Sequence, residues 1–247
     1  MAAETVADRL ADVRSRIARA AAAVGRDPGE IRLIGVSKGM GIDAIREAAA
    51  AGLSDFGENR VQEALEKMTA LGSEGSNGCS WHLIGRLQTN KVRAAVGRFS
   101  LIQSVDSARL GHAIDEAAGR TGIVQRVLIQ VNIGREAQKG GVDPSDLESL
   151  WRELTTCRHL RVEGLMAIPP AGDDPETARP YFRELRRLGD PLPAPTGDRR
   201  PLEYSMGMSH DFEAAVKEGA TMVRVGTAIF GPRSLAGDRS LTAGNGG

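Results

Sequence analysis

Strand-like and helix-like segments alternate eight times along this chain of 247 residues, and this alternation constrains the fold more than any other feature. Short apolar, β-branched runs predict eight strands, at 31–38, 53–59, 80–85, 100–106, 126–133, 161–168, 201–208 and 221–231. Segments with helical spacing of apolar residues lie between them. Such units give parallel strands with right-handed crossovers. Eight of them predict a single (β/α)8 TIM barrel, with an open doubly wound sheet as the alternative.

An extra helix is predicted in front of the first strand. Val6, Leu10, Val13 and Ile17 recur at steps of three and four residues, and Gly25 ends the pattern. This N-terminus has early acidic residues and no apolar core, so we expect no secretory signal. The composition does not change along the chain in a way that marks a second domain. We therefore assign residues 1–236 to one barrel and residues 237–247, rich in Gly and polar residues, to a flexible tail.

The charge balance excludes several classes of partner. With 32 basic and 32 acidic residues, the chain has no basic excess for nucleic acid or for an anionic membrane surface. It has no apolar run long enough to span a bilayer.

Cys79 and Cys157 are the two cysteines, without a CxxC motif, which fits a reducing cytoplasm. The cysteines and the four histidines show no metal-ligand spacing, so we expect no metal.

Lys38 is the first candidate for chemistry. Active groups of such barrels lie at the carboxyl ends of the strands, and Lys38 ends the first predicted strand, on one face with Ile34 and Val36. Partial burial there would lower its pKa and free the amine to form a Schiff base with a carbonyl. Of the 32 basic residues only five are Lys, and Arg cannot supply a neutral amine. The alternative is an ordinary surface lysine at a strand end.

Residues near the last two strands indicate an anion site. The segment Ser205-Met206-Gly207-Met208-Ser209 leads into a helix, and Gly226-Thr227 lies in the eighth predicted strand. Loops after strands seven and eight commonly hold phosphate in these barrels, because backbone N–H groups can approach the anion there. Glycines that only form turns are the alternative.

Arg224 is expected to face the barrel interior together with Met222 and Gly226. An unpaired buried charge is costly, so Arg224 needs a partner. That partner is either a ring nitrogen or anion of a bound ligand, or one of three carboxylates, Glu58, Glu163 and Glu203.

Three further polar residues each have two interpretations. Asn59 follows the second strand and could donate to a ligand or cap the next helix. His82, in mid-strand among apolar residues, favours a hydrogen-bonded core histidine over a catalytic one. Lys139 follows the fifth strand and faces either the barrel mouth or solvent.

Six segments of the chain together closely resemble the pyridoxal 5′-phosphate (PLP) homeostasis proteins. This is a family of PLP-binding proteins related in fold to the barrel domain of alanine racemase, fold type III. The matching segments run in order over nearly the whole chain: GVSK (35–38), FGENRVQE (56–63), WHLIGRLQTNK (81–91), IQSVDS (102–107), GLMAIPP (164–170) and YSMGMSHDFEAAVKEGATMVRVGTAIFG (204–231). Jointly these motifs are very specific.

The resemblance implies a PLP site. Lys38 matches the lysine that forms the Schiff base with the cofactor. Ser205 and the backbone of Gly226 and Thr227 match the phosphate site. Arg224 matches the arginine that faces the pyridine nitrogen.

Two more positions match residues that line the pocket, Asn59 and Met166. The chain departs from the family pattern after the lysine, where Gly39-Met40-Gly41 stands in place of a frequent Thr-Lys-Pro. It also has Arg86 where the family has a proline in the third-strand motif.

The residues favour a carrier over an enzyme. An arginine leaves the pyridine nitrogen unprotonated, which makes the ring a weaker electron sink. A racemase of this type also needs a second base, usually a Tyr on an added C-terminal β domain, and the chain has only Tyr181 and Tyr204. We expect a cytoplasmic, monomeric PLP carrier or buffer in vitamin B6 homeostasis, with PLP-dependent apoenzymes as partners. The alternatives are a PLP-dependent amino-acid racemase or lyase, and a ligand-free interaction module.

Overall fold

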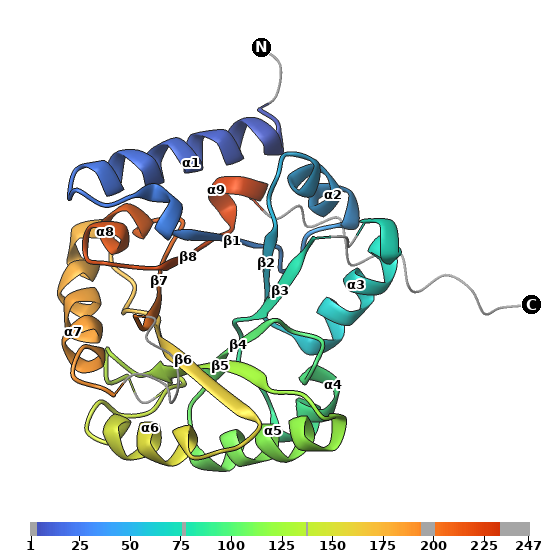
Figure 1. The fold of residues 1–247 in the computed structure, drawn as a ribbon. Coiled ribbons are helices and arrows are strands. Elements are labelled where there is room, and N and C mark those ends of the chain that lie inside the picture. Colours follow the sequence, from blue (N-terminus) through green and yellow to red (C-terminus); the bar gives the residue numbers. More distant parts are fainter. Residues whose placement is uncertain (1–3, 76–77, 137, 194–200, 233–247) are drawn as a thin grey trace, which may run out of the picture.

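Eight parallel strands form a closed barrel in the order of the sequence (Figure 1). The structure is a computed structural model, and it describes residues 4–75, 78–136, 138–193 and 201–232. The strands are β1 (Arg32–Val36), β2 (Asp55–Glu58), β3 (Ser80–Leu83), β4 (Leu101–Val105), β5 (Gln125–Val131), β6 (Leu160–Ala167), β7 (Glu203–Met208) and β8 (Met222–Val225). Pairing of β1 with β8, which sets Ile34 beside Arg224, closes the barrel. The predicted (β/α)8 barrel is confirmed, and the open sheet is wrong.

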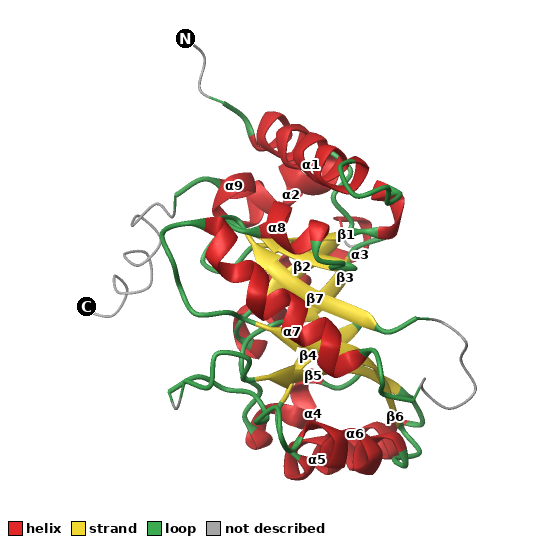
Figure 2. Cartoon of the chain, turned by 90° about the vertical axis from the view of Figure 1, so that its left-hand side faces the viewer, coloured by secondary structure: helices red, strands yellow, loops and turns green. Residues whose placement is uncertain are grey.

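Helices surround the strands on the outside of the barrel (Figure 2). The α-helices that follow β1 to β8 are α2 (Ile42–Ala50), α3 (Val61–Gly75), α4 (Val92–Ala95), α5 (Ala108–Thr121), α6 (Leu147–Thr155), α7 (Arg179–Gly189), α8 (Phe212–Lys217) and α9 (Thr227–Phe230). Three short 3-10 helices are η1 (Pro28–Glu30), η2 (Thr89–Lys91) and η3 (Pro175–Ala178). Among the described residues, no helix is long and apolar enough to cross a membrane.

The predicted N-terminal helix is α1 (Val6–Ala22), and it completes the ring of helices. Its apolar residues are buried, and it packs against α8, α9 and α2 (Figure 1). The helix after β8 is only four residues long, so it covers little of the sheet. The Arg9 Nε atom donates to the carbonyl oxygen of Ile229 at 2.7 Å, which ties α1 to α9. The extra helix therefore covers the side of the barrel that α9 leaves open.

Two predicted boundaries near the site need correction. The eighth strand ends at Val225 instead of 231, because Gly226 turns the backbone out of the extended region (φ −110°, ψ −82°) and α9 begins. The first strand ends at Val36, so Lys38 lies in the following loop rather than at the last strand position. The predicted tail at 237–247 and the domain boundary at 236 lie outside the described residues.

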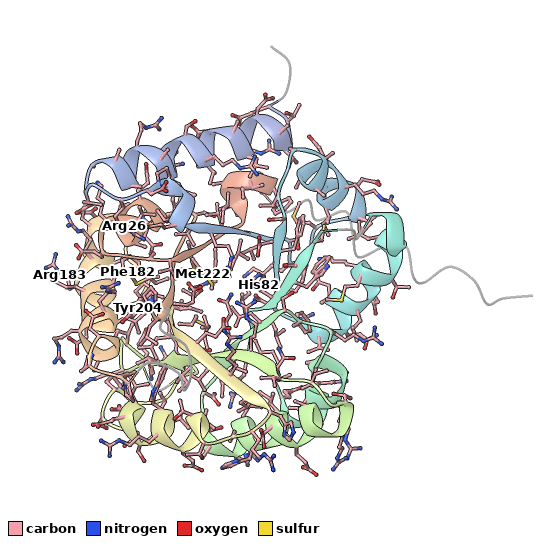
Figure 3. All side chains as sticks on the ribbon, viewed as in Figure 1. Arg26, His82, Phe182, Arg183, Tyr204 and Met222 are labelled. Carbon is pink, nitrogen blue, oxygen red and sulfur yellow. The ribbon has the colours of Figure 1, made fainter. Side chains whose placement is uncertain are left out.

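The barrel interior is filled by side chains and is not a channel. Its apolar cluster is formed by Ile34, Leu101, Leu128, Met166 and Met222. Met222 and His82 point into the ring of strands (Figure 3). Because this packing occupies the middle of the barrel, a ligand must bind at one of its ends.

Candidate functional site

A cavity of about 430 Å³ opens at the carboxyl ends of the strands, a size typical of small-molecule sites. Its wall is built by strand ends and the loops that follow them: Val36, Lys38, Asn59, Ile84, Gly85, Arg86, Gln130, Gly140, Ile168, Met208, Ser209, His210, Arg224, Gly226 and Thr227. A second cleft of about 540 Å³ lies at the opposite end, near Arg32 and Asp55. Barrels of this kind use the carboxyl end for chemistry, so we take the first cavity as the candidate site.

Lys38 supplies an uncommitted amine to this cavity. Its ammonium group makes no hydrogen bond or ion pair with any residue that the structure describes, although the side chain is half-buried. Lys139, by contrast, donates to the carbonyl oxygen of Pro169 at 3.1 Å and pairs with Glu136. The lysine in the cavity wall is therefore the one whose amine is left for a ligand.

The loop that carries Lys38 is held by a buried group that we call the Lys67 clamp, formed by Lys67, Glu58, Glu63 and Ser37. The Lys67 ammonium donates to the Ser37 carbonyl oxygen at 2.7 Å, to Glu58 at 2.7 Å and to Glu63 at 2.6 Å. Its three N–H donors are thus all used. The Ser37 hydroxyl donates to Glu58 at 2.7 Å, and the Gly39 amide donates to Glu63 at 2.6 Å. The backbone on both sides of the candidate lysine is therefore fixed.

Among the four residues of the Lys67 clamp, Glu58 is the one whose burial is energetically least favourable. Its side chain is fully buried, and its Oε2 atom has no hydrogen-bond partner in the described part of the chain. Burial raises the pKa of Glu58, and the hydrogen bonds from Lys67 and Ser37 oppose that rise without cancelling it. This clamp could not be predicted from the sequence, because a Lys and a Glu nine positions apart have no special meaning until α3 packs beside β2.

Arg224 lies at the floor of the cavity, where its charge is buried and the nearby Asp211 carboxylate does not form an ion pair with it. Its Nη1 atom donates to the Ser205 hydroxyl at 2.7 Å and its Nη2 atom to the Ala167 carbonyl oxygen at 2.9 Å. Both acceptors are neutral. Burial lowers the pKa of Arg224 to about 10, with the Asp211 carboxylate opposing the shift, so the guanidinium remains charged at neutral pH. A cation in such surroundings favours a ligand that brings an anion or an electron-rich acceptor.

The ion-pair interpretation of Arg224 is wrong. The three carboxylates considered for it all have other partners: Glu58 binds Lys67, Glu163 binds Arg126 through two bonds of 2.7 Å, and Glu203 accepts from Thr221. No carboxylate of the described chain forms an ion pair with Arg224.

Two backbone amides converge at the other side of the cavity. The Gly226 and Ala228 amides point at one oxygen atom, the Ser209 hydroxyl, at 3.0 and 3.4 Å. An oxygen acceptor therefore fits between them. A side chain at position 226 would bring its Cβ atom to 3.3 Å from the Val36 carbonyl oxygen, so glycine keeps this wall close to β1.

Five of the seven predicted cofactor residues line this cavity: Lys38, Asn59, Arg224, Gly226 and Thr227. Met166 and Ser205 do not, because both are fully buried in the barrel interior, where Ser205 binds Arg224 instead of facing the cavity. Ser209, which belongs to the segment predicted to form an anion site but was not among the seven predicted cofactor residues, lies in the wall. Its position beyond the end of the seventh strand was the available signal.

The structure also shows the surroundings of Asn59 and His82, for which the sequence left two interpretations each. Asn59 makes no capping hydrogen bond within the described chain, and its backbone packs against Gly85, where a Cβ atom would lie 2.3 Å from the Asn59 carbonyl oxygen. His82 is a hydrogen-bonded core residue as predicted, with Asp55 at 2.9 Å and Gln103 at 3.1 Å.

The fold and this site define a class of proteins, the barrels of the alanine racemase N-terminal domain type, whose family model matches residues 9–234. Two relatives are both named pyridoxal phosphate homeostasis protein. The protein of Aquifex aeolicus is 46% identical over 226 residues, 92% of this chain and 97% of the relative. That of Pseudomonas aeruginosa is 41% identical over 236 residues, 96% of this chain and 99% of the relative. The chain belongs to the pyridoxal phosphate homeostasis protein family.

Solved structures agree with this assignment. PipY of Synechococcus elongatus, determined with PLP bound, is 39% identical with a TM-score of 0.76, over 92% of this chain and all of PipY. Alanine racemase of Corynebacterium glutamicum has a TM-score of 0.61 at 21% identity, over 90% of this chain and 60% of the racemase, and shares the fold.

Proposed function

We propose that this chain binds PLP as a Schiff base on Lys38 and acts in intracellular PLP homeostasis, as a carrier or buffer of the cofactor without a committed reaction. The observation that carries the proposal is that one cavity holds both the uncommitted Lys38 amine and the buried Arg224 guanidinium, whose two hydrogen-bond acceptors are neutral. The names of the relatives and the PLP-bound structure of PipY support it.

The residues of the cavity fit the chemical groups of this cofactor. PLP supplies an aldehyde that condenses with a primary amine, together with a pyridine nitrogen and an anionic phosphate. Lys38 would provide the amine, and the backbone of Gly226 and Thr227 together with the Ser209 hydroxyl would bind the phosphate. Arg224 would donate to the ring nitrogen. The apolar side chains that line the wall, Val36, Ile84 and Ile168, would exclude water from the ring.

The same residues favour storage over turnover. A guanidinium can only donate hydrogen bonds, so Arg224 would leave the ring nitrogen unprotonated and the ring a weak electron sink. Neither tyrosine lines the cavity in the described structure. The Tyr204 hydroxyl donates to Asp190 at 2.8 Å, at the end of α7. Tyr181 lies in α7 and packs against the outer core. The racemase alternative would therefore have to use another base, and His210 is the titratable side chain in the wall that could act.

We further propose that the protein works in the cytoplasm as a monomer that delivers PLP to PLP-dependent apoenzymes. The two cysteines in a chain of 247 residues fit a reducing compartment. The zero net charge gives no support for nucleic acid or an anionic membrane as a partner.

The proposed function is tested by loading the protein with PLP and then measuring transfer of the PLP to another protein. The cofactor-free protein is titrated with PLP while visible absorbance is followed, then mixed with a PLP-dependent apoenzyme or with single L-amino acids. We expect stoichiometric uptake, reactivation of the apoenzyme and no D-amino acid. Rapid racemisation that is lost in His210→Ala would instead support the enzyme alternative, and absence of any uptake would refute both.

Substitution of Arg224 by Met separates its binding role from its effect on stability. Removing a charge-assisted hydrogen bond to the cofactor is expected to weaken PLP binding roughly 10- to 100-fold. The cofactor-free protein should lose only a moderate amount of stability, because removal of the desolvated charge offsets part of the effect of leaving the Ser205 hydroxyl and the Ala167 carbonyl oxygen without this donor. Absorbance titration and urea unfolding of the cofactor-free protein measure the two effects. A large loss of stability with unchanged affinity would contradict this role.

A further inference from the structure

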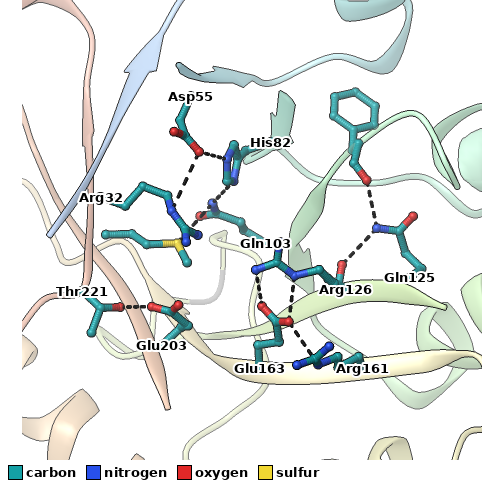
Figure 4. A network of polar contacts seen from close by, with 12 residues as sticks. Arg32, Asp55, His82, Gln103, Gln125, Arg126, Arg161, Glu163, Glu203 and Thr221 are labelled. Carbon is teal, nitrogen blue, oxygen red and sulfur yellow. Dashed lines mark hydrogen bonds and ion pairs between the residues drawn. The ribbon is translucent and has the colours of Figure 1, made fainter. Parts of the chain in front are cut away.

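A chain of hydrogen bonds runs through the barrel from the cavity floor to the opposite end. We call Arg224, Ser205, Gln103, His82 and Asp55, in that order, the polar thread. The successive distances are 2.7 Å from Arg224 to Ser205, 2.6 Å from Ser205 to Gln103, 3.1 Å from Gln103 to His82 and 2.9 Å from His82 to Asp55. Figure 4 shows the part of the thread farthest from the cavity, where Gln103, His82 and Asp55 follow one another. The thread thus connects residues from β8, β7, β4, β3 and β2.

Chemistry fixes the direction of every bond in the polar thread. A guanidinium only donates, so the Ser205 hydroxyl accepts from Arg224 and gives its own proton to the Gln103 carbonyl oxygen. The Gln103 amide nitrogen must then face His82 and donate to its Nδ1 atom. His82 is therefore neutral, with its proton on Nε2, where it donates to Asp55. Burial lowers the pKa of His82 in spite of the Asp55 carboxylate, which agrees with the neutral form.

The middle of the polar thread, from Ser205 through Gln103 to His82, is buried in the barrel interior, so water cannot replace these members. Gln103 and Ser205 are fully buried, and His82 is 1% exposed. Met222, from the apolar cluster of the interior, touches the Gln103 amide with its sulfur atom at 3.9 Å. A break at one link would leave unsatisfied polar groups on both sides, and this makes the arrangement of the whole thread stiff.

We propose that Gln103 and His82 are positioning residues of the PLP site, which fix the Ser205 hydroxyl and, through it, the direction of the Arg224 guanidinium. This inference rests on the proposed function. Neither residue lines the cavity, so neither touches the cofactor. Because no carboxylate aligns Arg224 in the described structure, its direction depends on two neutral acceptors, and one of these, the Ser205 hydroxyl, is itself held by Gln103.

The far end of the polar thread is anchored by charge. Burial works to raise the pKa of Asp55, but hydrogen bonds from His82 and Ser54 and the nearby charges outweigh it, so the pKa lies below its ordinary value. Asp55 also lies 3.8 Å from the Arg32 guanidinium. An ionised Asp55 keeps the His82 proton on Nε2, which leaves Nδ1 free to accept from Gln103.

The test compares two buried glutamines. Gln103→Leu cuts the polar thread with little change in volume. Gln125→Leu is the matched control: Gln125, on β5, is also buried and donates to the carbonyl oxygens of Phe99 and Arg126 at 3.0 and 3.1 Å (Figure 4). Among the described residues, none of its hydrogen bonds involves a member of the polar thread. PLP affinity and the wavelength of the visible absorbance band are measured for both variants and for the unmodified protein.

We expect Gln103→Leu to bind PLP roughly 5-fold more weakly, the loss of about one hydrogen bond, and to shift the band, because the donor at the ring is misdirected. Gln125→Leu should keep both values even where it lowers the melting temperature. Equal affinity and an unshifted band in the two variants would overturn the proposal. If Gln103→Leu fails to fold, Ser205→Ala cuts the thread with the loss of one oxygen, and the same band shift is expected. Absence of PLP uptake by the unmodified protein would refute the proposed function instead.

Discussion

Replacement of Lys38 by Ala is expected to abolish the visible absorbance of the protein mixed with PLP and to weaken PLP binding by at least ~100-fold, since a covalent bond is lost and only the polar contacts remain. The stability of the cofactor-free protein should barely change, because the Lys38 ammonium has no partner among the described residues and lies half-exposed at the cavity. Absorbance titration and thermal unfolding measure the two effects.

Lys91→Ala is the control for this substitution. Lys91 belongs to the short helix η2, is exposed and does not line the candidate cavity. Its loss should leave both the absorbance band and the affinity unchanged. A normal band in Lys38→Ala would show that another amine holds the cofactor.

Replacement of Lys67 by Met is expected to reduce the free energy of unfolding by about 3–5 kcal/mol at neutral pH, the usual effect of removing one partner from a buried ion pair. In the described structure Lys67 is the only cationic partner of Glu58, which is fully buried. Urea unfolding of the cofactor-free protein measures this change. The variant should also bind PLP more weakly, because the Ser37 carbonyl oxygen beside Lys38 loses its donor.

A second substitution and a change of pH identify the cause. Glu58→Gln added to Lys67→Met removes the unpaired carboxylate and should restore a large part of the lost stability. In Lys67→Met alone, burial raises the pKa of Glu58 without opposition from an ammonium group. The folded state then binds more protons than the unfolded state, so stability rises as the pH falls from 7 toward 5. A deficit that does not change with pH and is not reduced in the double variant would contradict this account.

The barrel could be predicted from the sequence because its signal is repeated. Each β-branched run, such as the one that ends at Val36, has the same relation to the helix that follows, and eight such units admit few folds. The end of the eighth strand was placed wrongly because Thr227, Ile229 and Phe230 are residue types that favour strands. In the structure they form one helical turn, and Ile229 and Phe230 pack into the outer core.

The cavity residues could be predicted where they lie at or just beyond the end of a strand, as for Arg224 in β8 and Lys38 in the loop after β1. It was not predictable where chemistry depends on contacts across the barrel. Ser205 and Ser209 lie four positions apart in one segment, and only the closed fold shows that the first binds Arg224 while the second faces the cavity. Gln103 belongs to a motif that matches the family, but no role could be assigned to it from the sequence, because its partners His82 and Ser205 come from β3 and β7 only in the closed barrel.

The most direct test of the central claim is to trap the cofactor and find the residue that carries it. The protein is loaded with PLP, reduced with borohydride, digested and mapped by mass spectrometry. We predict one stable pyridoxyl adduct, on the peptide that contains Lys38, with the visible band lost on reduction. An adduct on Lys139 or Lys67 with an unmodified Lys38, or no adduct under conditions in which PLP binds, would contradict the assignment of this cavity as a Schiff-base site.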